Sequence, residues 1–363
     1  MKILKLEISE LRIPFKFTFK HASAERNQTQ SLWIELHTDS GIVAHGESCP
    51  REYVTAETIH SARSFILEIK ERLYQTDWDI NTLEEWTEEH RHLINDNPAA
   101  WCAIEMALID ALAKTSEQSI EALIGTPEVS GDFYYSAIIG DAPTNLFEQW
   151  LGKYLSLNMS DFKIKLSGDP NKDREHIEKI HCATNGHCLI RVDANNMFNT
   201  AQRAIDYCKK FSDRIYAIEE PVKARRFDEL QEIAAQLRVK IILDESFTTI
   251  EDFACLTDQD TPWIINLRVS KLGGILRSME AIRLARQHQV PIIIGAHVGE
   301  TSLLTRAAIC VANVAKDVLL AQEGAFGTHF LDRDVTEHSI RFGMNGCISS
   351  KDLKNARFGL GVI

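Results

Sequence analysis

The spacing of hydrophobic residues along this 363-residue chain changes near position 126. In the preceding part, alternating apolar residues predict strands at 3–8, 31–36 and 42–44. The stretch AAWCAIEMALIDALAK at 99–114 predicts a helix, because its apolar residues recur at helical steps. Strands followed by helices predict a separate α+β capping domain over residues 1–125.

A stretch of polar and aromatic residues, FKFTFKHASAERNQTQ at 15–30, interrupts the predicted strands. It has no clear period, so we predict a long loop, and long loops in compact domains often act as lids. Lys20, His21 and Arg26 in this loop, and Arg51 in the next, would suit selection of an anionic or polar part of a substrate. Solvated surface positions have the same composition, so both interpretations stay open.

In the second half, short apolar runs alternate with stretches of helical periodicity. Strands that alternate with helices indicate parallel βαβ units. Eight units predict a TIM-type (β/α) barrel over 126–325, with a doubly wound open sheet as the alternative. The turn-rich residues 326–363 are expected to return to the capping domain. The eight runs are FYYSAII at 133, FKIKL at 162, CLIRV at 188, IYAI at 215, KIIL at 240, WIINL at 263, PIIIG at 291 and VLLA at 318.

Ionisable residues recur at or just after the ends of six of these runs, 25 to 28 residues apart. Each interval corresponds to one βα unit. In a parallel barrel the carboxyl ends of the strands gather on one face, where active sites lie. We therefore expect all six side chains to converge. They are Lys165, Asp193, Glu219, Asp244, Lys271 and His297.

Three carboxylates, Asp193, Glu219 and Asp244, follow consecutive strands and would be neighbours. Adjacent carboxylates repel one another unless they are protonated or neutralised by a cation. Oxygen-only ligation favours a hard ion, so Mg²⁺ is the expected cofactor, with Mn²⁺ as an alternative. Asn195 shares the strand face of Asp193 and is a candidate for the outer shell of this site. Ordinary strand-end turns contain the same residue types, but three acids in one register disfavour that alternative.

Lys163 and Lys165 share a strand face, and Lys271 lies four strands further on, at the opposite wall of an eight-stranded barrel. Burial and a nearby dication lower the pKa of a lysine toward working pH. A metal makes the α-proton of a carboxylate removable by stabilising the charge that develops on its oxygens. We therefore predict α-proton abstraction by these lysines. The neighbouring acids Glu220 and Glu245 are expected to face elsewhere and hold a lysine.

Composition limits the partners. The net charge of −12 makes nucleic-acid binding unexpected, because such proteins present clustered Lys and Arg. No stretch has the apolar length that spans a bilayer and the N-terminus does not resemble a signal peptide, so we expect a cytoplasmic protein without a membrane partner. The eight scattered cysteines are expected to be free thiols. A possible zinc site precedes a strand and lacks a second ligand pair, so surface positions are the better interpretation. It comprises His181, Cys182, His187 and Cys188.

The motifs FKIKL, RVDANN, IEEP, LDES and NLRVSKLGG, in this order, resemble the enolase superfamily, specifically its muconate-lactonizing-enzyme subgroup. The resemblance covers nearly the whole chain, including the capping module. It implies a Mg²⁺ ion, an acid/base pair of lysines and a homo-oligomer. The implied residues are Asp193, Glu219 and Asp244 for the metal, Lys165 and Lys271 for proton transfer, and Lys163 in support of Lys165.

Reactions of this subgroup include cycloisomerisation, dehydration to succinylbenzoate, and racemisation or epimerisation of N-acyl amino acids and dipeptides. In the dipeptide epimerases of the subgroup that this chain resembles, the last strand carries an Asp-x-Asp-Gly motif whose acids hold a substrate ammonium. The matching residues here are Ala321-Gln322-Glu323-Gly324, so Glu323 would fill the second role and the first acid is absent. A dipeptide with a free amine is therefore disfavoured.

His297 occupies the position of the general base in the mandelate-racemase subgroup, but its partner position is Arg268 instead of Asp. We expect His297 to contact substrate or to pack as a satisfied histidine. Glu300 matches an acid of the lactonizing subgroup and is expected to hydrogen-bond substrate. Arg268 lies an odd number of residues from Lys271, so it is expected to point away from the site.

Opposed lysines favour racemisation or epimerisation of a small amino-acid-derived carboxylate, either an N-acyl amino acid or a dipeptide-like molecule. Cycloisomerisation, or dehydration by β-elimination, with the same residues is the alternative. A catalytically silent protein that binds a metal or small molecule is an alternative of another class. The presence of all three acids and both lysines disfavours it.

Overall fold

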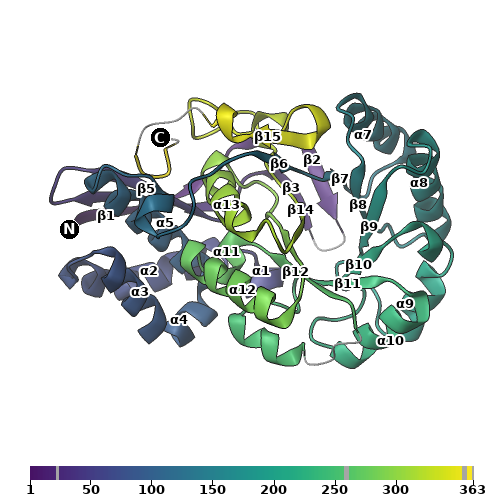
Figure 1. The fold of residues 1–363 in the computed structure, drawn as a ribbon, viewed down its shortest axis with the longest axis horizontal. Helices are drawn as coiled ribbons and strands as arrows, with labels where there is room; N and C mark the ends of the chain where they lie inside the picture. The colour runs from purple at the N-terminus through teal and green to yellow at the C-terminus, as the bar shows by residue number, and fades with distance from the viewer. Residues whose placement is uncertain (22–23, 257–260, 354–357, 362–363) are drawn as a thin grey trace.

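A computed structural model describes residues 1–21, 24–256, 261–353 and 358–361. It places an α+β part beside a parallel barrel whose strands follow one another around a curled sheet (Figure 1). The predicted fold class is therefore confirmed. The domain boundaries at 125 and 325 stay a prediction.

The capping part is built on an antiparallel sheet in the order β1-β4-β5. Its longest helix, α5 (Pro98–Thr115), is buried on all sides from Pro98 to Ala113, as expected for a helix inside a core. It packs against β5 and against α11 of the barrel. A Cβ on Gly46 of β5 would lie 1.9 Å from the carbonyl oxygen of Ala103, so only glycine permits this close approach. The remaining elements of this part are β1 (Ile3–Leu11), β4 (Ser31–Thr38), β5 (Val43–Ser48), α1 (Glu52–Thr55), α2 (Ile59–Gln75), α3 (Ile80–Glu89), α4 (Arg91–Asp96) and α6 (Ile120–Leu123).

The predicted loop over 15–30 is wrong, because these residues form an antiparallel hairpin of β2 (Pro14–His21) and β3 (Ala24–Gln28). Its first strand alternates phenylalanine with lysine and threonine, which is a strand pattern. Phe15 of this strand is buried against Phe330 and Leu331 from the C-terminal tail. The polar second strand concealed the pairing in the sequence.

Eight parallel strands form the barrel within the described residues, in sequential order. The sheet closes where Tyr135 forms a parallel bridge with Gln322 and the N–H of Ser136 donates to the Gln322 carbonyl at 2.8 Å. The strands are β7 (Ala137–Ile139), β8 (Asp161–Lys165), β9 (Leu189–Asp193), β10 (Ala217–Glu219), β11 (Lys240–Leu243), β12 (Trp263–Leu267), β13 (Ile292–Ile294) and β14 (Leu319–Gln322).

Helices follow most strands and cover the outside of the barrel (Figure 1). After β11 the described residues contain a 3-10 segment, Ile250–Cys255, in place of a helix. The predicted strand at 133 divides in two, because β6 (Asp132–Tyr134) pairs with β15 (Cys347–Ser349) and only β7 enters the barrel. The helices are α7 (Thr144–Ser156), α8 (Pro170–Ala183), α9 (Ala201–Cys208), α10 (Phe227–Leu237), α11 (Val269–Leu272), α12 (Ile275–His288) and α13 (Ser302–Ala315).

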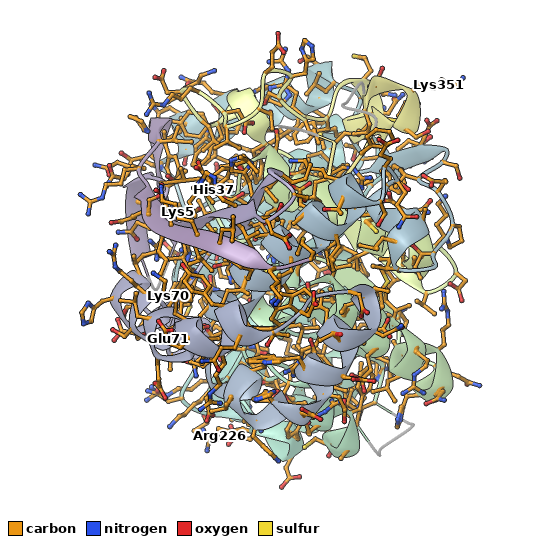
Figure 2. The ribbon with its side chains drawn as sticks, turned by 90° about the vertical axis from the view of Figure 1, so that its left-hand side faces the viewer. Lys5, His37, Lys70, Glu71, Arg226 and Lys351 are labelled. Atoms are coloured by element: carbon orange, nitrogen blue, oxygen red, sulfur yellow. The ribbon has the colours of Figure 1, made fainter. Side chains whose placement is uncertain are left out.

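The tail contacts the capping part at two places. The N–H of Lys16 donates to the Phe330 carbonyl at 2.9 Å, and that of Gly359 donates to the Gln118 carbonyl at 2.9 Å. Figure 2 views the molecule from the capping side, where the exposed Lys5 of β1 lies near the surface. Among the described helices, none combines the length and apolar character needed to cross a bilayer.

Candidate active site

A pocket lies at the carboxyl ends of the barrel strands. Its lining combines cationic and carboxylate side chains with apolar residues and a tyrosine from the capping part. We call it the lysine pocket. It is lined by Tyr53, Ile138, Lys163, Lys165, Asn195, Asp244, Arg268, Ala296, Val298, Glu323 and Phe326.

The ends of neighbouring strands bring the predicted residues together. Lys165 is the last residue of β8, Asp193 of β9 and Glu219 of β10. The parallel register places Lys165 beside Asp193, and Asp193 beside Glu219. Asp244 follows β11 directly, so the three acids come from adjacent strands.

Lys163 lies among the acids. Its Nζ is 2.6 Å from Glu219 Oε2, 3.1 Å from Glu323 Oε2 and 3.2 Å from Asp193 Oδ2. Burial disfavours the charged amine, but the three carboxylates outweigh it and raise the pKa of Lys163. The amine therefore stays charged and neutralises the carboxylates around it.

Lys165 lies in the same pocket, as expected from the period of a strand. Its Nζ donates to Asp193 Oδ2 at 2.5 Å and to Asn195 Oδ1 at 3.0 Å. Asn195 has φ +43°, in the left-handed region that asparagine tolerates, and its N–H donates to Asp193 Oδ1 at 2.9 Å. Asn195 thus holds both the amine and the carboxylate in place.

Lys271 lies in the short helix α11, beyond the end of its strand, and is fully buried. Its Nζ donates to the Asn266 carbonyl at 2.6 Å, to the Asp244 carbonyl at 2.8 Å and to Asp244 Oδ1 at 3.1 Å. Burial lowers the pKa of Lys271, and the carboxylate of Asp244 opposes this shift. Asp244, which lines the lysine pocket, connects Lys271 to it.

The expectation that Arg268 points away from the site is wrong. Its Nη2 donates to Asp244 Oδ2 at 2.5 Å and lies 3.8 Å from Glu219 Oε1. The strand ends at Leu267 and the chain turns into α11, so the alternation of strand faces no longer applies after that residue.

Glu323 forms a buried network with two cations. Its Oε1 accepts from Arg191 Nη2 at 2.9 Å, and its Oε2 accepts from Lys163 at 3.1 Å. Burial opposes the charged carboxylate, but Lys163 and Arg191 lower the pKa of Glu323 to about 2. Arg191 is not among the predicted site residues, although it lies two residues before Asp193 on the same strand face.

The expectation that Glu220 holds a lysine is wrong. For Glu245 it stays a prediction, because the charge of Glu245 acts on the nearby Lys271. Glu220 accepts the backbone N–H groups of Asp244 at 2.8 Å and Ser246 at 2.6 Å, and so fixes the turn that carries Asp244. Neither carboxylate oxygen of the buried Glu245 has a hydrogen-bond partner within the described residues. Burial and the adjacent Asp244 raise the pKa of Glu245 to about 8.

His297 is buried, and its ring nitrogens have no hydrogen-bond partner within the described part of the chain. Burial and the nearby Arg268 hold the pKa of His297 well below its usual value, so the ring is neutral. Glu300 accepts the His297 N–H at 2.7 Å, and burial raises the pKa of Glu300 to about 8. Their contact with substrate stays a prediction.

Of the predicted lid residues, the structure describes the side chains of Arg26 and Arg51. The side chains of Lys20 and His21 lie outside the described residues. Arg26 hydrogen-bonds to a glutamine four residues further on. Arg51 is 1% exposed and donates to backbone carbonyls, including that of Val298 at 2.8 Å, so it joins the capping part to the loop after β13.

Within the described residues, no three Asp, Glu, His or Cys side chains are grouped as a metal site. At the strand ends, the acids pair with Lys163 and Arg268, which lie between them. The donor chemistry fits Mg²⁺, which prefers oxygen ligands: Asp193 and Glu219 from adjacent strands both lie within 3.2 Å of Lys163 Nζ, and Asp244 pairs with Arg268 and Lys271. Burial and the nearby Asp193 raise the pKa of Glu219 to about 8, a repulsion that a bound cation would relieve.

The alternative zinc cluster is also not assembled among the residues described. His181 Nε2 accepts a hydrogen bond from Arg214 Nη1 at 3.3 Å, and Cys182 is an exposed free thiol. All eight cysteines are free, as expected.

Two family models match the chain. The model described as Mandelate racemase / muconate lactonizing enzyme, N-terminal domain, matches residues 5–125. The model described as Enolase C-terminal domain-like matches residues 148–362.

Curated relatives and solved structures agree with these matches. The L-amino acid-D/L-Glu epimerase of Francisella philomiragia is 25% identical over 99% of both chains. The N-succinyl-L-Arg/Lys racemase of Bacillus cereus is 22% identical over 86% of this chain and 84% of its own. A crystal structure of a dipeptide epimerase from Methylococcus capsulatus, complexed with Mg and L-Arg-D-Lys, has a TM-score of 0.84 and 24% identity and covers both chains fully.

The structural likeness establishes the common fold. The relatives also support the predicted enzyme class, an isomerase of the enolase superfamily. Since the two family models together cover most of its length, the chain belongs to the mandelate racemase/muconate lactonizing enzyme family of the enolase superfamily.

Proposed function

We propose that this protein is a Mg²⁺-dependent racemase or epimerase that removes and returns the α-proton of an amino-acid-derived carboxylate. One observation carries the proposal: two lysines reach the same row of acids from opposite ends. Lys165 Nζ bonds Asp193 at one end, and Lys271 Nζ bonds Asp244 at the other.

In this proposal Asp193, Glu219 and Asp244 hold Mg²⁺. The bound ion supplies positive charge that stabilises the substrate carboxylate as its α-proton leaves. The amine of Lys165 or Lys271 takes the proton from one face, and the other amine returns a proton to the opposite face, which inverts the configuration. Asp193 and the side-chain oxygen of Asn195 hold the Lys165 amine in the pocket.

We further propose that the substrate carries no free ammonium group, as in an N-acyl amino acid. A free ammonium group needs a carboxylate partner, and Glu323 is the acid at the end of the last barrel strand. Arg191 and Lys163 already neutralise Glu323. A neutral amide nitrogen avoids the repulsion that these two cations would exert on an ammonium.

The test incubates N-acetyl amino acids and dipeptides with the enzyme and Mg²⁺ in D₂O. Loss of the α-proton signal by NMR, with inversion by chiral chromatography, supports the proposal, and we expect it for N-acetyl substrates above all. A new alkene or lactone without inversion would support elimination or cycloisomerisation. Ligand-induced thermal stabilisation without any exchange would favour a silent binding protein.

Single lysine variants test the two-base geometry. Lys165→Ala and Lys271→Ala should each lower racemisation by about 10²–10⁴-fold, while one enantiomer still exchanges its proton with the remaining amine. Lys179→Ala is the matched control, because Lys179 lies on the surface of α8 and pairs with Glu148. Full inversion by Lys271→Ala would contradict the assignment.

A further inference from the structure

A second pocket adjoins the lysine pocket. Its lining is dominated by six aromatic side chains from the capping part, the barrel and the tail, and we call it the aromatic pocket. The six are Phe17, Trp150, Tyr154, Phe326, Phe330 and Phe342.

The rings of this pocket come from separate segments of the chain. Phe17 of β2 lies 5.8 Å from Trp150 of α7 and 5.0 Å from Phe330 of the tail, measured between ring centroids. Phe326 lies 6.2 Å from Phe342. The hairpin, the barrel and the tail therefore meet in one apolar surface.

The two pockets share part of their lining. Ile138, Val298 and Phe326 line both of them. A molecule whose carboxylate lies beside Lys163 and Lys165 therefore has the aromatic pocket next to it, with no polar barrier among the shared residues.

The charge of the aromatic pocket restricts what it accepts. No Asp or Glu belongs to its described lining, and Lys153, whose pKa is lowered by burial, is the one Lys or Arg among those lining residues. His329 Nε2 lies 2.7 Å from the Phe342 carbonyl, and burial lowers the pKa of His329, so the ring is neutral. A cationic substituent would find no counter-charge here, whereas an apolar one would gain by leaving water.

We propose that the aromatic pocket is a specificity site that receives a large apolar substituent, aromatic or branched aliphatic, of the reacting carboxylate. The proposal rests on the function proposed above, because it assigns the reacting carbon to the lysine pocket. It predicts that substrates with a bulky apolar group are preferred over small or cationic ones.

The experiment compares N-acetyl-L-phenylalanine, N-acetyl-L-alanine and N-acetyl-L-lysine in the D₂O exchange assay with Mg²⁺. The phenylalanine compound should have a kcat/KM at least about tenfold higher than either of the others. Phe17→Ala and Trp150→Ala, which alter the pocket from two different elements, should each reduce the phenylalanine-to-alanine ratio about tenfold. Circular dichroism checks that both variants fold.

Tyr134→Ala is the matched control, because Tyr134 is 57% exposed and lies outside the pocket lining. It should leave the ratio unchanged. A wild-type ratio near one, or a ratio unaffected by both pocket variants, overturns the proposal.

Calorimetric titration of the three compounds in the presence of Mg²⁺ separates this proposal from the function on which it rests. If no compound exchanges its α-proton, at least tenfold tighter binding of the phenylalanine compound supports the pocket and refutes the racemase. Exchange without a preference refutes the pocket and leaves the racemase standing. Equal binding, or none, together with no exchange overturns both.

Discussion

A buried ion pair connects the last helix of the capping part to the barrel. Arg306 of α13 donates through Nη1 to Glu121 Oε1 at 2.7 Å and through Nη2 to Glu121 Oε2 at 2.8 Å. The Glu121 side chain is 1% exposed and that of Arg306 is 9% exposed. Arg306→Met would leave the Glu121 carboxylate buried without its counter-charge.

The loss of stability expected for Arg306→Met follows from the burial of the ion pair. Removing one partner of a buried pair costs about 3–5 kcal/mol, because the remaining charge loses both its partner and its water. The exposed pair of Arg286 and Asp317 offers a matched comparison, since it is also bidentate, at 2.9 and 2.7 Å. Its side chains are 40% and 59% exposed, so Arg286→Met should cost about 1 kcal/mol or less.

Urea unfolding followed by circular dichroism measures the difference. For Arg306→Met we expect the urea concentration at the unfolding midpoint to fall by about 1 M or more. For Arg286→Met it should fall by only a few tenths of about 1 M. The double variant Arg306→Met/Glu121→Leu should recover most of the loss, because it removes both charges. Equal midpoints for the two arginine variants would refute the claim that burial, and not bidentate geometry, sets the cost.

Three further predictions concern pH, packing and metal. Burial raises the pKa of Glu105 from its usual 4.5 to about 8, so its charged form is penalised in the folded state. The free energy of unfolding should therefore fall as pH rises from about 5 to 8, and Glu105→Gln should flatten that decline in urea titrations at several pH values. Gly46→Ala should lower the free energy of unfolding by about 1–3 kcal/mol or more through its clash with Ala103, whereas Gly152→Ala, with no atom within 4 Å of the new Cβ, should raise it by about 0.5–1 kcal/mol. Mg²⁺ at a hundredfold excess over its Kd should stabilise the protein by about 2.7 kcal/mol in thermal unfolding, and Asp193→Asn should abolish that gain.

The strand-end residues could be predicted because they depend on local periodicity. Within a strand, alternate residues share a face, and Lys163 and Lys165 accordingly line one pocket. The prediction failed where that period ends. Arg268 follows the last residue of β12 and turns toward Asp244 as the chain enters α11.

The pairing of Glu323 with two cations could not be predicted from the sequence. Its charge is neutralised by Arg191 of β9 and Lys163 of β8, while Glu323 itself follows β14, the last strand. These residues become neighbours only because the barrel closes between Tyr135 and Gln322. A sequence motif can therefore place an acid at the right strand end. Whether that acid is free to bind a substrate ammonium depends on the cations that barrel closure brings beside it. Removing one of the two cations, as in Arg191→Met, should release Glu323 and improve binding of a free-amine dipeptide relative to its N-acetyl form in calorimetric titrations. An unchanged preference would mean that neutralisation of Glu323 does not determine which α-nitrogen the site accepts.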